Sequence, residues 1–258
     1  NDTVDVLISE SSLSVGEDGT SDTFTVRLNS EPISTVLVSM DLNGSDELSV
    51  SDNLSFGPDN WSVSQTVTVA GVDDAVADDN QTSVLSVLSS SSDSKYNGLS
   101  DNLSVLTADN DTVGFSLSQS TAAVSENGSV TDSISVVLTS EPTAAVTLSV
   151  TDNDTSEVSY SPLSLVFGSG NWSVSQVITL TGKDDNVSDD NQTTLLTLSV
   201  SGGDYSGLNS QTVTVTTSDN DTVDVLISES SLSVGEDGTS DTFTVRLNSE
   251  PISTVLVS

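Results

Sequence analysis

Hydrophobic residues alternate with serine and threonine over many short stretches of this chain. Within residues 22–29, Phe24, Val26 and Leu28 fall on one face of an extended strand, while the residues between them are polar or charged. A period of two residues is typical of strands that bury one face. No segment shows convincing helical periodicity. The pattern therefore predicts an all-β fold with a core of branched aliphatic side chains.

Seven such stretches occupy residues 1–109. We expect strands at residues 4–17 (with a kink near Glu10 to Ser12), 22–29, 35–42, 47–56, 61–71, 82–90 and 102–108. In the fifth strand, Trp61, Val63, Val67 and Val69 are expected to point into the core. Turns rich in glycine, asparagine and aspartate separate the strands. Seven short strands in about 110 residues are typical of an immunoglobulin-like β-sandwich.

The chain contains internal repeats. The tetrapeptide Asn-Asp-Thr-Val begins at residues 1, 110 and 220, and residues 220–258 repeat residues 1–39 without a single change. We therefore predict one repeat at 1–109, a second at 110–219 and the start of a further repeat at 220–258. Self-similar repeats indicate sandwiches arranged end to end as a rod.

The last 39 residues hold too few strands to bury a sandwich core alone. We expect them to belong to a longer array from which this chain is an excerpt. The alternative is that a neighbouring chain completes them by adding strands.

The composition excludes several classes of function. The chain has no cysteine and no histidine, and its 4 Lys and Arg face 39 Asp and Glu, which gives a net charge of −35. It therefore lacks the residues of a Ser-His-Asp or Cys-His nucleophile and of a thiolate or imidazole zinc site. The charge repels phosphate backbones, so we expect no nucleic-acid partner. No apolar run is long enough to span a bilayer, so we expect no membrane insertion.

Short motifs in a shared order resemble the Calx-β family, which occurs in sodium–calcium exchangers, an integrin β-chain and long bacterial and algal surface proteins. In the first repeat they are residues 13–19, 24–28, 60–61, 65–69, 73–74 and 109–111. In the second repeat they are residues 124–128, 171–172, 184–185 and 219–221. The resemblance covers the whole chain and implies tandem Calx-β-like sandwiches.

Acidic residues gather at one predicted pole. If strand directions alternate, three loops and the end of the last strand of each repeat meet there. In the first repeat they carry Glu17, Asp18, Asp41, Asp46, Glu47, Asp73, Asp74, Asp78, Asp79, Asp109 and Asp111. Carboxylates this close need a counter-charge, and Ca²⁺ is a hard cation that takes oxygen ligands. The alternative is a solvated acidic surface built from turn-forming residues.

The resemblance implies which carboxylates bind Ca²⁺. In the first repeat they are Glu17, Asp73, Asp74, Asp109 and Asp111, and in the second they are Glu126, Asp184, Asp185, Asp219 and Asp221. In the second repeat, Asn127 stands where the first repeat has Asp18. We expect Ca²⁺ at the domain junctions to stiffen the array.

Asparagine-X-Ser/Thr sequons are unusually frequent. Thirteen of the 17 asparagines lie in one: Asn1, Asn43, Asn53, Asn60, Asn80, Asn102, Asn110, Asn127, Asn153, Asn171, Asn186, Asn191 and Asn220. A sequon is an acceptor for N-glycans on surface loops of secreted proteins. The pattern indicates a densely N-glycosylated extracellular or cell-surface protein. Alternatively, asparagine serves as a turn former in a serine-rich chain.

Two functions fit these features. The first is a structural segment of a long extracellular fibre or stalk, whose partners are neighbouring copies of the repeat, with lateral self-association left open. The second is a Ca²⁺-dependent extender of a bacterial-type surface adhesin without N-glycans. Paired carboxylates occur in glycosidases, but here they lie on repeated turns with no aromatic-lined cleft, so we expect no enzymatic activity.

Overall fold

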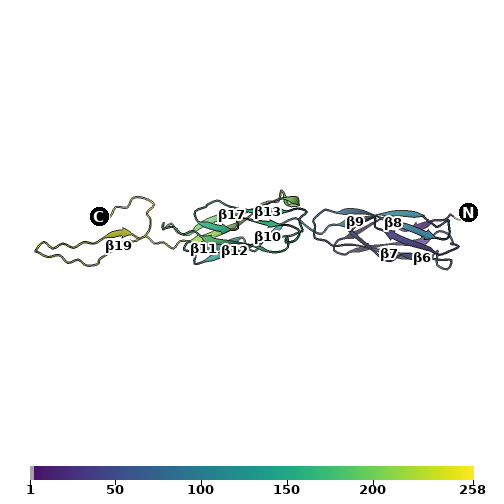
Figure 1. Cartoon of the computed structure of the whole chain (residues 1–258), viewed down its shortest axis with the longest axis horizontal. Coiled ribbons are helices and arrows are strands. Elements are labelled where there is room, and N and C mark those ends of the chain that lie inside the picture. Colours follow the sequence, from purple (N-terminus) through teal and green to yellow (C-terminus); the bar gives the residue numbers. More distant parts are fainter. Residues whose placement is uncertain (1–2) are drawn as a thin grey trace. The chain divides into compact units, whose positions relative to one another are not determined.

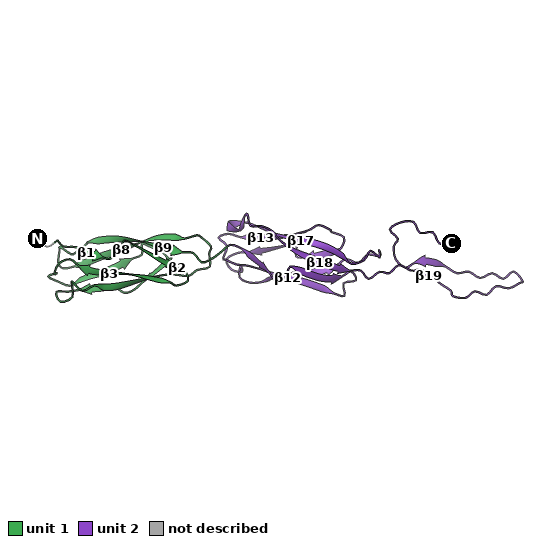
Figure 2. Cartoon of the chain, turned by 180° about the vertical axis from the view of Figure 1, so that it is seen from behind, with its two compact units in different colours: residues 1–112 green, residues 113–258 purple. Residues whose placement is uncertain are grey.

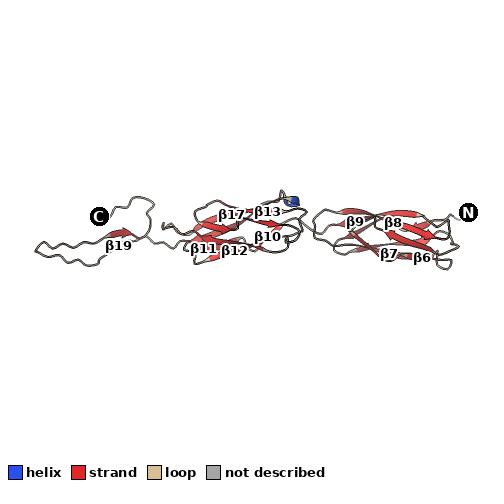
Figure 3. Ribbon diagram, in the orientation of Figure 1, coloured by secondary structure: helices blue, strands red, loops and turns tan. Residues whose placement is uncertain are grey.

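A computed structural model describes residues 3–258 of the chain. It divides into two compact units, Asn1–Thr112 and Val113–Ser258 (Figure 1, Figure 2). Strands dominate both units, and the helix labelled η1 is a single 3-10 turn at Gly203–Tyr205 (Figure 3). In the described part of the chain, no helix has the length and hydrophobicity that crossing a membrane requires.

Unit 1 is a sandwich of two sheets. The first sheet has the order β1 (Val6–Ile8), β3 (Ser21–Leu28), β7 (Gln65–Gly71) and β5 (Leu48–Val50). The second has the order β2 (Ser12–Gly16), β9 (Ser100–Ala108), β8 (Gln81–Ser91), β4 (Val36–Asp41) and β6 (Leu54–Phe56). Strands β2 and β9 pair in parallel, and the other pairs are antiparallel.

Unit 2 repeats this topology. One sheet has the order β10 (Phe115–Leu117), β12 (Thr131–Leu138), β16 (Gln176–Gly182) and β14 (Val158–Ser161). The other has the order β11 (Thr121–Ser125), β18 (Gln211–Ser218), β17 (Gln192–Ser201), β13 (Val146–Asp152) and β15 (Ser164–Phe167). The predicted all-β class and the repeated sandwich are confirmed.

Two of the seven predicted strands are each divided between the sheets. The stretch 4–17 forms β1 in one sheet and β2 in the other, and the stretch 47–56 forms β5 and β6 in the same way. The breaks fall at exposed polar residues, Glu10 and Ser11 in the first case and Ser51 to Asn53 in the second. Each of these two stretches therefore supplies one edge strand to each sheet of the sandwich.

The fifth predicted strand begins four residues later than expected. Residues 57–64 form a turn in which Asn60 Oδ1 accepts a hydrogen bond from the Gly57 N–H at 2.6 Å, and the Trp61 N–H donates to Gly57 O at 3.0 Å. Trp61 packs against the core, but Val63 is 57% exposed, so the prediction that Val63 points inward was wrong. The turn rotates the chain and breaks the two-residue alternation.

A buried tyrosine ties the two sheets together at the same place in each unit. Tyr96 Oη donates to Ser30 O at 2.6 Å and accepts from the Ser30 N–H at 3.0 Å. In unit 2, Tyr205 makes the same pair of bonds to Ser140 at 2.7 and 3.1 Å. Each hydroxyl is thereby satisfied inside an otherwise aliphatic core, as burial of a polar group requires.

Residues 220–258 have the sequence of residues 1–39 but little of their structure. Only β19 (Val225–Ile227) and β20 (Val245–Leu247) form, in the pairing that β1 and β3 have in unit 1. Val15 in β2 is 3% exposed, whereas its counterpart Val234 is 72% exposed. The strands β2 and β4 therefore depend on pairing with β9 and β8, not on local sequence alone.

Candidate metal centre

One pole of unit 1 brings its acidic loops together through backbone contacts. The Glu17 N–H donates to Ala108 O at 3.1 Å, which holds the end of β2 beside the end of β9. Gly71 at the end of β7 lies so close to Gly16 that an added Cβ would be 2.2 Å from the Gly16 carbonyl oxygen. The acids that follow these three strands are thus forced into one region.

Three of the predicted ligands in each unit form a compact group. In unit 1, Glu17, Asp109 and Asp111 each offer a carboxylate oxygen, and these atoms lie within 4.8 Å of one another. In unit 2 the same holds for the equivalent acids, Glu126, Asp219 and Asp221. Glu17 is only 1% exposed, and Glu126 is 2% exposed. The structure thus brings six of the ten predicted residues into two equivalent clusters.

The other four predicted residues border these clusters. The Asn110 side-chain amide donates to Asp73 Oδ1 at 3.2 Å, and the Asn220 amide donates to Asp184 Oδ1 at 3.1 Å. Asp74 helps to raise the pKa of Glu17, and Asp185 does the same for Glu126, although burial is the larger cause in both cases. All ten predicted residues therefore lie at or beside the two acidic poles.

Glu47 and Glu157 extend the clusters beyond the motif-based prediction. The Oε2 atom of each is buried and has no hydrogen-bond partner among the described residues. Burial raises the pKa of Glu47, with further contributions from Asp78 and Asp74, and burial also raises the pKa of Glu157. Strand parity placed Glu47 at this pole, whereas the sequence analysis did not predict Glu157, which precedes β14 as Glu47 precedes β5.

The poles hold uncompensated negative charge. Burial, together with Asp109, Asp74 and Glu47, raises the pKa of Glu17 to about 7, against an opposing hydrogen bond from the Asn110 N–H. Burial and neighbouring aspartates also raise the pKa of Asp111 and Asp221. The chain has only four basic residues to set against these acids. Several buried carboxylates with an orphaned oxygen fit a hard cation that takes six to eight oxygen ligands.

The two poles also differ in charge at the residue that follows β7 and β16. Lys183 in unit 2 stands where unit 1 has Val72, and the backbone N–H of each donates to the carbonyl oxygen of the nearby glutamate, Glu157 or Glu47. The Lys183 ammonium donates to Thr155 O. It also contributes to the lowered pKa of Asp154, after the hydrogen bonds from Ser156. Unit 2 therefore carries a positively charged side chain at the rim of its acidic pole, where unit 1 has the uncharged Val72.

The predicted glycan acceptors fall into two groups, with Asn1 outside the described residues. Five donate side-chain amide hydrogen bonds within the fold: Asn43, Asn60, Asn110, Asn171 and Asn220. The other seven are exposed, and their amide nitrogens donate no hydrogen bond to described residues: Asn53, Asn80, Asn102, Asn127, Asn153, Asn186 and Asn191. Asn43, Asn110 and Asn220 are exposed as well, so the second group differs in that its amide nitrogens are not engaged within the fold.

The chain matches the model of one known protein family. The Calx-beta domain matches residues 1–111 and again residues 108–221. Among solved structures, CBD12 from CALX1.2 is 13% identical with a TM-score of 0.38, covering 83% of this chain and 99% of that chain. The calcium binding domain CBD12 of CALX1.1 is 18% identical with a TM-score of 0.35, covering 76% and 80%. Domains 4 and 5 of the S-layer protein SbsC are 14% identical with a TM-score of 0.35, covering 84% and 100%. No curated protein matches the chain.

Proposed function

Because the chain belongs to the Calx-beta domain family, which matches it twice in tandem, we propose that each unit binds Ca²⁺ at its acidic pole. The family includes calcium-binding domains, and hard oxygen ligands are what Ca²⁺ prefers. The wider role that we propose is non-enzymatic: a structural segment of a long extracellular fibre or stalk, coated with N-glycans.

One observation carries the calcium proposal. Glu17 is almost fully buried beside Asp109 and Asp111, and no basic side chain is among the groups that perturb its pKa. An isolated buried carboxylate is expensive to ionise, and such groups are normally paired or coordinate a metal. The orphaned oxygen of Glu47 adds a further acceptor at the same pole.

The residues of the pole have separate roles in this proposal. Glu17 and Glu47 hold the buried side of the site, and Asp109 and Asp111 tie it to the end of β9. Asp73, held by the Asn110 amide, brings in the loop between β7 and β8. A bound ion would supply the positive charge that offsets the repulsion among these groups. Binding is then expected to join three loops that are otherwise pushed apart.

Calorimetric titration of the metal-free chain with Ca²⁺ tests this proposal. We expect binding to both units, and saturation at about 100 times Kd should stabilise each unit by about 2.7 kcal/mol. The double variant Glu17→Gln and Glu126→Gln should lose most of the binding and of the rise in melting temperature. As a control with the same loss of charge, Glu10→Gln and Glu31→Gln alter two exposed acids away from the clusters. Equal binding by both variants would contradict the proposal.

The proposed glycan coat draws support from the number of sequons and from the accessible acceptors such as Asn53 and Asn80. Intact mass before and after enzymatic release of N-glycans tests it on protein from the native source. We expect a large loss of mass, with sugar mapped first to the exposed group of seven. A mass equal to that of the polypeptide alone would contradict the proposed N-glycosylation.

A second candidate is the Ca²⁺-dependent extender of a bacterial-type adhesin without N-glycans. It is favoured by the amides of Asn60 and Asn171, which are half-buried and bonded within equivalent turns. These two asparagines are accounted for by turn formation without any sugar. The mass measurement separates the candidates, since the extender requires unmodified sequons together with intact calcium binding.

A further inference from the structure

One asparagine in the segment that follows β9 holds two parts of the acidic pole of unit 1. The Asn110 side-chain amide donates to Asp73 Oδ1 at 3.2 Å, and the Asn110 backbone N–H donates to Glu17 Oε2 at 3.4 Å. Glu17 lies in the turn after β2, and Asp73 lies in the loop after β7. Asn110 is therefore bonded to two loops that come from different sheets of the sandwich.

The same arrangement recurs in unit 2. The Asn220 amide donates to Asp184 Oδ1 at 3.1 Å, and the Asn220 backbone N–H donates to Glu126 Oε2 at 3.3 Å. The residue before the aspartate differs, since Lys183 stands where unit 1 has Val72. The contacts of the asparagine are kept although their surroundings change, which indicates that they belong to the architecture of the pole.

A side-chain amide suits this position because the groups around it are hydrogen-bond acceptors. Asp109 is held by the backbone: its Oδ1 accepts from the Asp111 N–H at 2.7 Å, and its Oδ2 accepts from the Asp79 N–H at 2.8 Å. Asp73, in contrast, receives its hydrogen bond from a side chain. The Asn110 amide supplies that bond as a neutral donor. It therefore orients Asp73 without adding another negative charge to the pole.

We infer that Asn110 and Asn220 are positioning residues of the calcium site, each orienting one aspartate, Asp73 or Asp184, before the ion binds. The inference rests on the proposed function, in which the poles bind Ca²⁺. The Oε2 atom of Glu157, a residue only 7% exposed, has no partner among the described residues and points independently to a cation at this pole. Partners that orient a metal ligand typically contribute about 10- to 100-fold to metal affinity.

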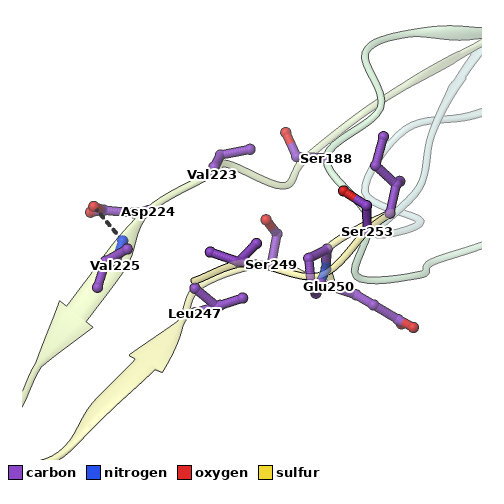
Figure 4. Close-up of a pocket in the computed structure, with 11 residues that line it drawn as sticks. Ser188, Val223, Asp224, Val225, Leu247, Ser249, Glu250 and Ser253 are labelled. Atoms are coloured by element: carbon purple, nitrogen blue, oxygen red, sulfur yellow. Dashed lines mark hydrogen bonds between the residues drawn. The ribbon is translucent and has the colours of Figure 1, made fainter. Parts of the chain in front are cut away.

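Other bonds of the same segment differ between the units. Ser188 Oγ donates to Asp221 O at 3.3 Å, and unit 1 has Ala77 in the place of Ser188. Further along, Asp224 Oδ1 accepts from the N–H of its neighbour Val225 at 2.7 Å, which is a local bond (Figure 4). The Ser188 bond gives unit 2 an additional hold on this segment. Unit 1 therefore offers the cleaner test of the asparagine.

Calcium titrations of full-length variants, produced without N-glycosylation, test the inference, with the unaltered unit 2 as internal reference. Asn110→Ala removes the amide without changing the charge, and the affinity of unit 1 should fall by about tenfold. Asp73→Ala should also weaken binding. Adding Asn110→Ala to Asp73→Ala should cause no further loss, because the amide then has nothing to hold. Asn53→Ala, which removes an exposed asparagine between β5 and β6, should bind as the wild type does.

Two results would overturn the inference. The first is an unchanged affinity in Asn110→Ala. The second is a double variant in which the losses of the two single variants multiply, since independent effects add in free energy.

Hydrogen exchange in chelator separates this failure from a failure of the calcium proposal. Without the ion, Asn110→Ala should exchange faster than the wild type in residues 73–80, whereas Asn53→Ala should not. Unchanged exchange would show that the amide does not hold the loop. A wild-type chain that binds no Ca²⁺ would overturn the proposed function, and with it the calcium role of the asparagine, even if Asn110→Ala speeds the exchange.

Discussion

Glu17 and Glu126 show how far burial controls a side chain in this protein. Each is an ordinary turn glutamate in the sequence, yet each is buried beside two aspartates. The raised pKa of each follows first from the loss of hydration and then from the neighbouring carboxylates. Exposed acids such as Glu10 have no such surroundings. Position in the fold, not residue type, therefore separates the candidate ligands from the solvated acids.

This difference predicts an unusual pH dependence for the metal-free chain. The pKa of Glu17 is about 7 in the folded state and near 4.5 in the unfolded state, so the folded state retains a proton that the unfolded state releases. Glu17 therefore makes its full contribution to the free energy of unfolding below pH 4.5. That contribution, up to about 3 kcal/mol, is lost as the pH rises through 7.

Urea unfolding in chelator across this pH range measures the effect. Glu17→Gln should flatten the fall in the free energy of unfolding of unit 1, whereas Glu10→Gln should leave it unchanged. Identical pH profiles for the wild type and Glu17→Gln would show that Glu17 ionises normally.

A second prediction concerns Lys183, which stands at the rim of the unit 2 pole. Lys183→Val recreates the residue found in unit 1 and removes one positive charge near Asp154. Because the charge is exposed, its removal should tighten Ca²⁺ binding by unit 2 only about two- to threefold. Val72→Lys should weaken binding by unit 1 to a similar degree. Site-resolved titrations of both variants measure this, and changes in the opposite direction would exclude the charge effect.

Strands in this protein form where a partner edge exists. Residues 12–16 are β2 in unit 1, but the same sequence at residues 231–235 forms no strand. The β1–β3 pair survives in both places because its two strands lie in the same segment. Tertiary pairing thus overrides intrinsic propensity for the edge strands of the sandwich.

The contact between Gly71 and Gly16 leads to a prediction about the loops. Gly71→Ala would place a Cβ 2.2 Å from a backbone oxygen that cannot move freely. Overpacking of this kind should destabilise unit 1 by about 1–3 kcal/mol. It should also weaken Ca²⁺ binding, because the loops that follow β2 and β7 separate. Gly182→Ala should do the same in unit 2, where Ser125 O is equally close.

Gly57→Ala is the control, because the added Cβ meets only the Asn60 side chain at 3.9 Å. Thermal unfolding and calcium titration of the three variants give the comparison. Gly71→Ala with the stability and affinity of Gly57→Ala would show that the two loops are not held by this contact.

The sequence predicts the strands and the acidic pole well, because alternation and strand parity depend only on spacing. It does not predict that 4–17 and 47–56 divide between sheets, since crossing from one sheet to the other keeps the same hydrophobic pattern. Val63 was misplaced because the Asn60 turn breaks the alternation. Glu157 was missed because its burial depends on the packing of the loop before β14, which no local motif records.

Across the whole molecule, the two units carry equivalent poles built only from their own residues. Each pole should therefore respond to Ca²⁺ by itself. Glu17→Gln alone should abolish the calcium-induced protection of unit 1 in hydrogen exchange while leaving unit 2 unchanged. Loss of protection in both units would show that one site controls the other.

The parallel pairing of β2 with β9, and of β11 with β18, bears on how each unit would withstand mechanical tension. Traction applied through the two ends of a unit pulls these paired strands along their length in opposite directions. Five residue pairs then resist shear together, from Ser12–Ser104 to Gly16–Ala108, and are not unzipped one after another. A fold tethered at such a clamp is suited to transmitting load.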